Sequence, residues 1–132
     1  MGCIEIMVSG GDPLLRQDFC ELYKYIIKKG IKVSLEITGA FMTKRILETL
    51  IKYPPTMVFV TIFGFTDQVY RKTTNSNVSI KKVLNNVKLL HKYNIRLKLR
   101  TTITKDNYKE VYLIKEFAKK LQVQYTPGVR IW

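Results

Sequence analysis

The sequence predicts an α/β protein built as a partial (βα) barrel, with about five parallel strands, helices on the outside and an incomplete, TIM-like outline. Two observations lead to this prediction. Five short apolar runs alternate with helical patterns along the 132 residues, which favours parallel strands joined by crossover helices. Within the first four of those runs apolar and polar residues alternate, so one face of each strand is apolar and the other is polar. We expect a single domain over residues 1–132.

The predicted elements follow one another in a regular order. The strands are expected at residues 3–9, 31–38, 57–63, 95–104 and 121–126, and the helices at 17–29, 43–53, 67–72, 79–93 and 107–120. Cap and turn residues mark their ends. The residues expected to start or stop helices, or to turn the chain, are Gly30, Thr43, Ser79, Asn94, Asn107 with Glu110 in a capping-box spacing, and Pro127 with Gly128.

Charged side chains mark the polar face of the predicted sheet. In an open sheet covered by helices on both faces, the strands read as continuous apolar runs. These strands instead place Glu5, Glu36, Lys98 and Arg100 on one face, and such groups are not buried without partners. A curved sheet with helices outside and a polar concave side fits this pattern and would hold a charged ligand. The alternatives are a solvated polar face or a face covered by another protein.

Composition and charge narrow the function classes. The chain carries a formal net charge of +13, which suggests a polyanion such as nucleic acid. The lysines, however, lie on the polar faces of several predicted helices, and no segment combines basic with stacking aromatic residues. Nucleic acid is therefore not the expected partner. No apolar run reaches the length of about eighteen residues that spans a membrane, and Cys3 and Cys20 form neither a CxxC pair nor a disulfide framework. We expect a cytoplasmic protein.

The loop from Ser9 to Pro13 joins the first predicted strand to the first predicted helix. It reads Ser9, Gly10, Gly11, Asp12, Pro13, and functional loops often lie at the carboxyl ends of strands in α/β folds. A glycine pair permits positive φ and lets a ligand approach the main chain. Asp12 can cap the following helix or contact a cationic group of a ligand. A tight turn with a helix cap is the simpler alternative.

Three segments resemble radical S-adenosylmethionine enzymes of the peptide-modifying, SPASM-type branch. Residues 8–16 read VSGGDPLLR and resemble the family's glycine–glycine–glutamate motif after its second strand. Residues 59–64 read FVTIFG, and with Tyr70, Thr73 and Thr74 downstream they resemble the fourth strand and its loop. Residues 97–107 read LKLRTTITKDN and resemble the fifth strand and the start of the next helix. The three segments occur in family order and cover nearly the whole chain.

The resemblance implies a site for S-adenosylmethionine. The segment from Ser9 to Pro13 would line the amino end of the cofactor, with Gly10, Gly11 and Asp12 receiving its ammonium group. Thr61 would lie near the ribose or the carboxylate, Lys98 or Arg100 would suit the carboxylate, and Ser34 or Thr38 would be neighbours. Simpler roles remain open, because Thr61 can be an ordinary strand residue and the two cations can neutralise Glu5 and Glu36.

The sequence also departs from the family pattern. The family's CxxxCxxC loop, whose three thiolates hold a 4Fe–4S cluster, is absent, as are the first strand and the cysteine-rich extension. Asp12 replaces the usual glutamate and Thr38 replaces the usual asparagine. We therefore expect a fragment or truncated member that keeps part of the cofactor pocket, has no metal ligands or catalytic residues of its own and is inactive alone.

Intact members of the family cleave S-adenosylmethionine reductively and abstract hydrogen from a peptide or protein substrate. The first alternative function is a self-associating module without catalysis, a homodimer that pairs the exposed edges of the sheet. The second, less favoured alternative is a basic nucleic-acid-binding domain.

Overall fold

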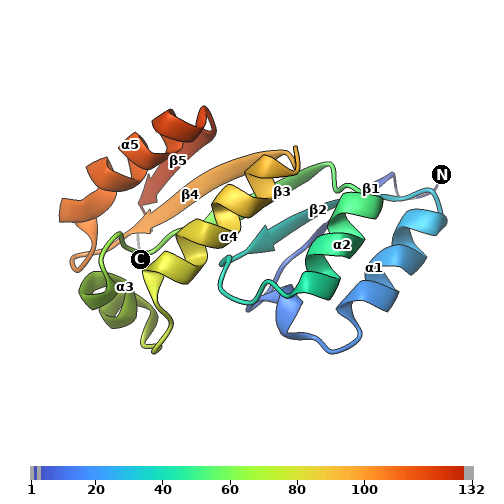
Figure 1. The fold of residues 1–132 in the computed structure, drawn as a ribbon, viewed down its shortest axis with the longest axis horizontal. Coiled ribbons are helices and arrows are strands. Elements are labelled where there is room, and N and C mark those ends of the chain that lie inside the picture. The colour runs from blue at the N-terminus through green and yellow to red at the C-terminus, as the bar shows by residue number, and fades with distance from the viewer. Residues whose placement is uncertain (1, 3, 130–132) are drawn as a thin grey trace.

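A computed structural model describes residue 2 and residues 4–129 and confirms the predicted fold class (Figure 1). Five parallel strands form one sheet in the order β1-β2-β3-β4-β5. Because the strand order follows the chain, each strand–helix unit lies beside the previous one, as in part of a barrel. The strands are β1 (Glu5–Val8), β2 (Lys32–Ile37), β3 (Met57–Thr61), β4 (Leu97–Ile103) and β5 (Gln124–Val129).

Helices connect the strands and cover one face of the sheet (Figure 1). The α-helices are α1 (Phe19–Lys28), α2 (Lys44–Lys52), α3 (Asp67–Thr74), α4 (Ile80–Lys92) and α5 (Val111–Leu121), and the short 3-10 helices are η1 (Pro13–Leu15) and η2 (Tyr108–Glu110). No helix among the described residues is long and apolar enough to cross a membrane.

The hydrophobic core lies between the sheet and the helices. The predicted apolar faces supply fully buried strand residues such as Leu35, Val58 and Leu99, and the helices contribute Leu50 and Leu90. Burying a side chain of this size contributes about 1.5–3 kcal/mol. On the opposite face Glu36, Lys98 and Arg100 stay partly exposed, whereas Ser34 is buried and bonds to Glu5. The sheet therefore has one packed face and one largely open face, as the alternation predicts.

Several predicted helix ends are confirmed. Gly30 and Asn94 adopt left-handed conformations, with φ of 79° and 59°, just after α1 and α4. Thr43 caps α2, because its hydroxyl accepts a hydrogen bond of 3.2 Å from the Ile46 amide. These ends are set by local chemistry, since each needs only a residue that tolerates positive φ or accepts from a free amide.

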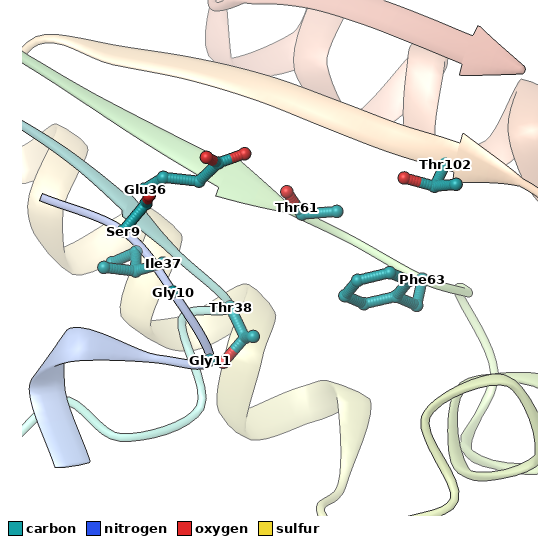
Figure 2. A pocket seen from close by; sticks show the side chains of 9 residues that line it. All are labelled: Ser9, Gly10, Gly11, Glu36, Ile37, Thr38, Thr61, Phe63 and Thr102. Atoms are coloured by element: carbon teal, nitrogen blue, oxygen red, sulfur yellow. The ribbon is translucent and has the colours of Figure 1, made fainter. Parts of the chain in front are cut away.

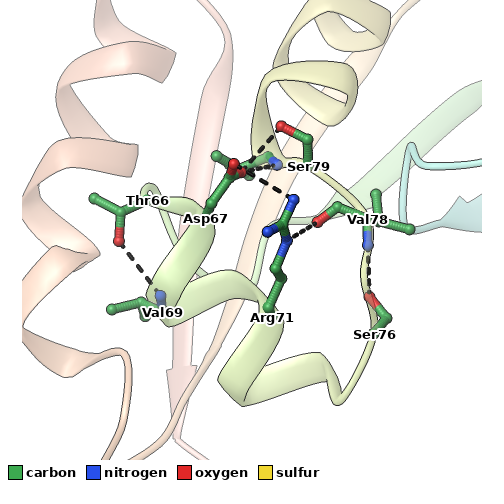
Figure 3. A network of polar contacts seen from close by, with 8 residues as sticks. Thr66, Asp67, Val69, Arg71, Ser76, Val78 and Ser79 are labelled. Carbon is green, nitrogen blue, oxygen red and sulfur yellow. Dashed lines mark hydrogen bonds and ion pairs between the residues drawn. The ribbon is translucent and has the colours of Figure 1, made fainter.

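Two predicted helix starts are wrong in their chemistry. Ser79 makes no capping bond; the Asp67 carboxylate accepts from the Ile80 amide at 2.8 Å and from the Ser79 hydroxyl at 3.0 Å (Figure 3). Asn107 and Glu110 form no capping box, because both side chains bond to other segments. In each case a residue distant in the sequence supplies or takes the hydrogen bond, and local spacing cannot reveal that.

The C-terminal strand also differs from the prediction. Leu121 ends α5, Gln122 turns the chain with φ of 56°, and β5 begins only at Gln124. Pro127, predicted as a turn residue, pairs with Thr101 inside the strand. An edge strand tolerates proline because it needs no donor on its outer side. The predicted positions of Cys3 and of residues 130–132 lie outside the described residues.

Candidate functional site

A polar cavity of about 340 Å³ opens at the carboxyl ends of β1 to β4 (Figure 2). Parallel strands bring their carboxyl ends to one edge, so residues far apart in the sequence meet there. The lining consists of the loop after β1, the end of β2, the end of β3 with the residues after it, and the end of β4. Its residues are Ser9, Gly10, Gly11, Glu36, Ile37, Thr38, Thr61, Phe63 and Thr102.

The glycine pair forms one wall of this cavity. Gly10 and Gly11 have φ of 95° and 52°, a region that residues with a side chain rarely adopt. A Cβ atom on either glycine would meet no protein atom within 4 Å. The space next to this main chain is therefore open, and a ligand can approach the peptide groups directly.

Asp12 uses its carboxylate inside the protein. It is 7% exposed, and Oδ1 accepts from the Leu14 amide at 3.0 Å. Oδ2 accepts from the amide of Thr38 at 2.9 Å and from its hydroxyl at 2.6 Å. Asp12 therefore caps the short helix η1, whereas the predicted helix at 17–29 begins at Phe19 with Asp18 at its N-cap position. The same carboxylate also ties the glycine loop to the end of β2, which holds two cavity walls together.

A charged pair extends the polar face toward the cavity. The Glu36 carboxylate lines the cavity and lies 3.4 Å from Nη1 of Arg100. The Arg100 guanidinium stacks on the Phe59 ring at 3.7 Å from its centroid, an arrangement that suits a planar cation. Arg100 therefore neutralises Glu36. This is the simpler of the two roles that the sequence left open for Arg100, the other being contact with the cofactor's carboxylate. Both side chains are about 40% exposed, so solvent weakens this pair.

The structure brings together half of the residues that the sequence singled out. Ser9, Gly10, Gly11, Thr38 and Thr61 line the cavity. The other five do not line it. Asp12 and Pro13 belong to the buried turn that follows the glycine loop. Ser34 donates a hydrogen bond of 2.9 Å to Glu5. Lys98 and Arg100 lie on the open face of β4, farther from its carboxyl end than Thr102.

Four lining residues were not predicted as site residues: Glu36, Ile37, Phe63 and Thr102. A signal for two of them existed in the sequence. Glu36 lies on the same polar face as Ser34 and nearer to the carboxyl end of its strand. Thr102 lies on the same polar face as Lys98 and Arg100, and it too is nearer to the carboxyl end. Position along the strand, combined with the polar face, would have found them.

A second, more apolar cavity of about 380 Å³ adjoins the first. The two share Gly11, Thr38 and Phe63, and α3 contributes Tyr70 to the second cavity's wall. Burial, together with the nearby charge of Asp12, raises the pKa of the Tyr70 phenol to about 12. Tyr70 is therefore a neutral hydroxyl at physiological pH.

The iron–sulfur cluster implied by the resemblance does not fit this chain. The sequence has two cysteines, whereas the cluster loop needs three thiolates. Cys20 is 4% exposed and packs in the hydrophobic core. Among residue 2 and residues 4–129 there is no group of three or more His, Cys, Asp or Glu side chains able to hold a metal.

Comparisons with known proteins agree with the resemblance. The family model "Radical SAM superfamily" matches residues 1–118. The chain is 28% identical over 116 residues to an AdoMet-dependent heme synthase of Methanosarcina barkeri, covering 88% of this chain and 33% of that protein. It is 25% identical over 125 residues to a GTP 3',8-cyclase of Synechocystis, covering 94% and 38%. The chain thus spans 33% and 38% of the lengths of these two curated relatives.

Solved structures share the fold. Streptococcus suis SuiB superposes with a TM-score of 0.83 at 13% identity, over 97% of this chain and 30% of SuiB. SuiB has also been solved bound to S-adenosylmethionine and bound to its precursor peptide SuiA.

Proposed function

The chain belongs to the radical SAM superfamily, and on that premise we propose that its glycine-lined cavity binds S-adenosylmethionine. The observation that carries this proposal is the open main chain of Gly10 and Gly11 in the wall of a cavity that the acidic residue Glu36 also lines. S-adenosylmethionine carries a sulfonium, an ammonium, a carboxylate and ribose hydroxyl groups, and it supplies radical chemistry in enzymes. Its solved complex with SuiB, which has the same fold, supports the assignment.

The lining residues have complementary chemistry. Glu36 is an acceptor and a negative charge, which suits either the cationic groups or the ribose hydroxyls of the cofactor. Thr38, Thr61 and Thr102 offer hydroxyl groups that both donate and accept. The peptide groups of the glycine loop can bond to the amino-acid end of the ligand. Asp12 would act behind this loop by holding it in place, since its own carboxylate already has three donors.

Reductive cleavage is not part of this proposal for the chain alone. With two cysteines it lacks the three thiolates of a cluster site, so no step that needs the cluster is assigned to it. The chain would bind and orient the cofactor, and the reducing centre would have to come from elsewhere. We propose a peptide or protein substrate by analogy with the SuiB–SuiA complex. A cytoplasmic location is a separate proposal, and it rests on the cysteine usage of the sequence.

The test is an anaerobic calorimetric titration of the chain with S-adenosylmethionine, before and after reconstitution with iron and sulfide. We expect binding in both states, because the proposed pocket contains no cluster ligand. Gly11→Val should abolish the binding, since a side chain would fill the open space and strain the main chain. A wild-type chain that binds in neither state would overturn the proposal.

Gly30→Val is the matched control for this substitution. Gly30 also has positive φ, at 79°, and a Cβ there also meets nothing within 4 Å. Both variants therefore carry a comparable main-chain strain, but Gly30 lies after α1 and outside the cavity lining. Equal loss of binding in both variants would show that Gly11→Val acts through stability alone.

A further inference from the structure

Asn107 is a fully buried amide that joins three main-chain groups. It is 0% exposed, and its Nδ2 donates to the carbonyl oxygens of Phe63 at 3.1 Å and Thr102 at 3.0 Å. Its Oδ1 accepts from the Thr104 amide at 2.8 Å. The side chain thus uses both donor hydrogens and its acceptor on three main-chain groups in two segments, one after β3 and one at the end of β4.

These bonds lie where β3 and β4 separate. The last paired residues of the two strands are Thr61 and Arg100, followed by one more main-chain bond from the Ile62 amide to the Arg100 carbonyl at 2.8 Å. Beyond that point the strands no longer bond to each other. Carbonyl groups left without partners in the interior are costly. Asn107 takes over from the strand ladder and bridges the two diverging ends.

Both bridged carbonyls belong to residues of the cavity wall. Phe63 and Thr102 line the proposed cofactor site, where Figure 2 shows their side chains on neighbouring strand ends. We propose that Asn107 is a positioning residue: it sets the separation of Phe63 and Thr102 and so the shape of this side of the cavity. The inference rests on the proposed function for its ligand, although its geometry does not depend on that function. Supporting groups of this kind hold binding residues to within fractions of an ångström.

Glu110 offers a matched comparison within the same segment. Its carboxylate accepts from the Phe65 amide at 2.5 Å, from the Thr66 amide at 3.0 Å and from the Thr66 hydroxyl at 2.6 Å. Like Asn107, Glu110 thus makes three hydrogen bonds, but all three hold the connection after β3, whereas Asn107 makes one bond there and two to the end of β4. Neither Phe65 nor Thr66 lines the cavity. A role in shaping the cavity should belong to Asn107 and not to Glu110.

The experiment compares S-adenosylmethionine affinity in the wild-type chain, Asn107→Asp, Asn107→Ala and Glu110→Ala. Asn107→Asp is isosteric and keeps the acceptor for Thr104, but it turns a carboxylate oxygen toward two carbonyls. We expect both Asn107 variants to bind about tenfold more weakly or worse, because the carbonyls of Phe63 and Thr102 lose the donor that holds the two strand ends together. Glu110→Ala should change the affinity less than about threefold, although urea unfolding should show that this variant is destabilised as well.

Amide chemical shifts give a second readout that needs no ligand. In Asn107→Asp the amides of Thr61 and Thr102 should shift, whereas Glu110→Ala should leave them in place. Unchanged shifts in Asn107→Asp, or an equal loss of affinity in Glu110→Ala and Asn107→Ala, would overturn the inference. A wild-type chain that does not bind S-adenosylmethionine would overturn the proposed ligand only, and the shifts would still decide the role of Asn107.

Discussion

Asp12, in the loop after β1, holds Thr38 at the end of β2 by two hydrogen bonds to a single carboxylate oxygen. The amide of Thr38 donates at 2.9 Å and its hydroxyl at 2.6 Å. Thr38 lines the polar cavity, and Asp12 continues directly from the glycine loop that lines it as well. This link therefore joins two walls of the site, and it uses the two residues at which the chain departs from the family pattern.

Replacing Asp12 tests this link. Asp12→Asn keeps the volume of the side chain but replaces one carboxylate oxygen with an NH₂ group. That group faces the donors of either Leu14 or Thr38, so at least one hydrogen bond of this buried residue is lost. We expect the free energy of unfolding, measured in urea, to fall by about 2 kcal/mol. Asp18→Asn is the control, because Asp18 is exposed and contacts the equally exposed Arg16. An equal effect of both variants would contradict the role given to Asp12.

Glu36 should matter for the ligand more than for stability. Its pair with Arg100 is about 40% exposed on each side, so Glu36→Gln should leave the unfolding midpoint nearly unchanged. The loss of the negative charge in the cavity should weaken S-adenosylmethionine binding about tenfold. Calorimetry on the two proteins at equal ionic strength measures this difference. Unchanged affinity would remove Glu36 from the proposed site.

Gly64 is a packing constraint between β3 and α3. A Cβ atom there would lie 2.8 Å from the Tyr70 amide nitrogen and 3.0 Å from the Tyr70 Cα. Because these are main-chain atoms, the neighbour cannot yield by a side-chain rotation. We expect Gly64→Ala to destabilise the protein by about 1–3 kcal/mol in urea unfolding. Gly128→Ala, whose Cβ would have an ordinary contact of 3.8 Å to the Thr101 carbonyl, should be tolerated.

The hydrogen bonds of the Asp67 carboxylate should make the protein less stable in acid. The Ile80 amide and the Ser79 hydroxyl hold the pKa of its carboxyl below the ordinary value of 3.8 (Figure 3). A depressed pKa contributes stability that is present above the unfolded-state pKa and is lost as the pH falls through the folded-state pKa. The melting temperature should therefore drop less steeply below about pH 4 in Asp67→Asn than in the wild type.

Ser79→Ala separates the two causes of this shift. It removes the hydroxyl but keeps the Ile80 amide, which is the larger cause. This variant should retain most of the acid dependence of the wild type. The same slope in wild type and Asp67→Asn would contradict the helix-capping role of Asp67.

The order of the elements and the apolar face of each strand could be read from local patterns. Residues such as Val33, Leu35, Val58 and Leu99 are buried as the alternation predicted. The helix stop at Gly30 and the cap at Thr43 also followed from single residues. The start of β5 could not be predicted in this way. Pairing with β4 along the edge of the sheet, and not local propensity, placed Pro127 inside a strand.

The site shows the same division. The glycine loop was visible in the sequence because positive φ and an open main chain are properties of glycine itself. The sequence by itself determined the fold class, the family and the loop at the carboxyl end of β1, since all three depend on local patterns and on their order along the chain. Only the tertiary structure decided that Asp12 bonds Thr38, that Asp67 caps α4 and that Asn107 bridges Phe63 and Thr102. The physical reason is that a buried polar group bonds to whichever partner the packed fold brings within reach, whatever its distance along the chain.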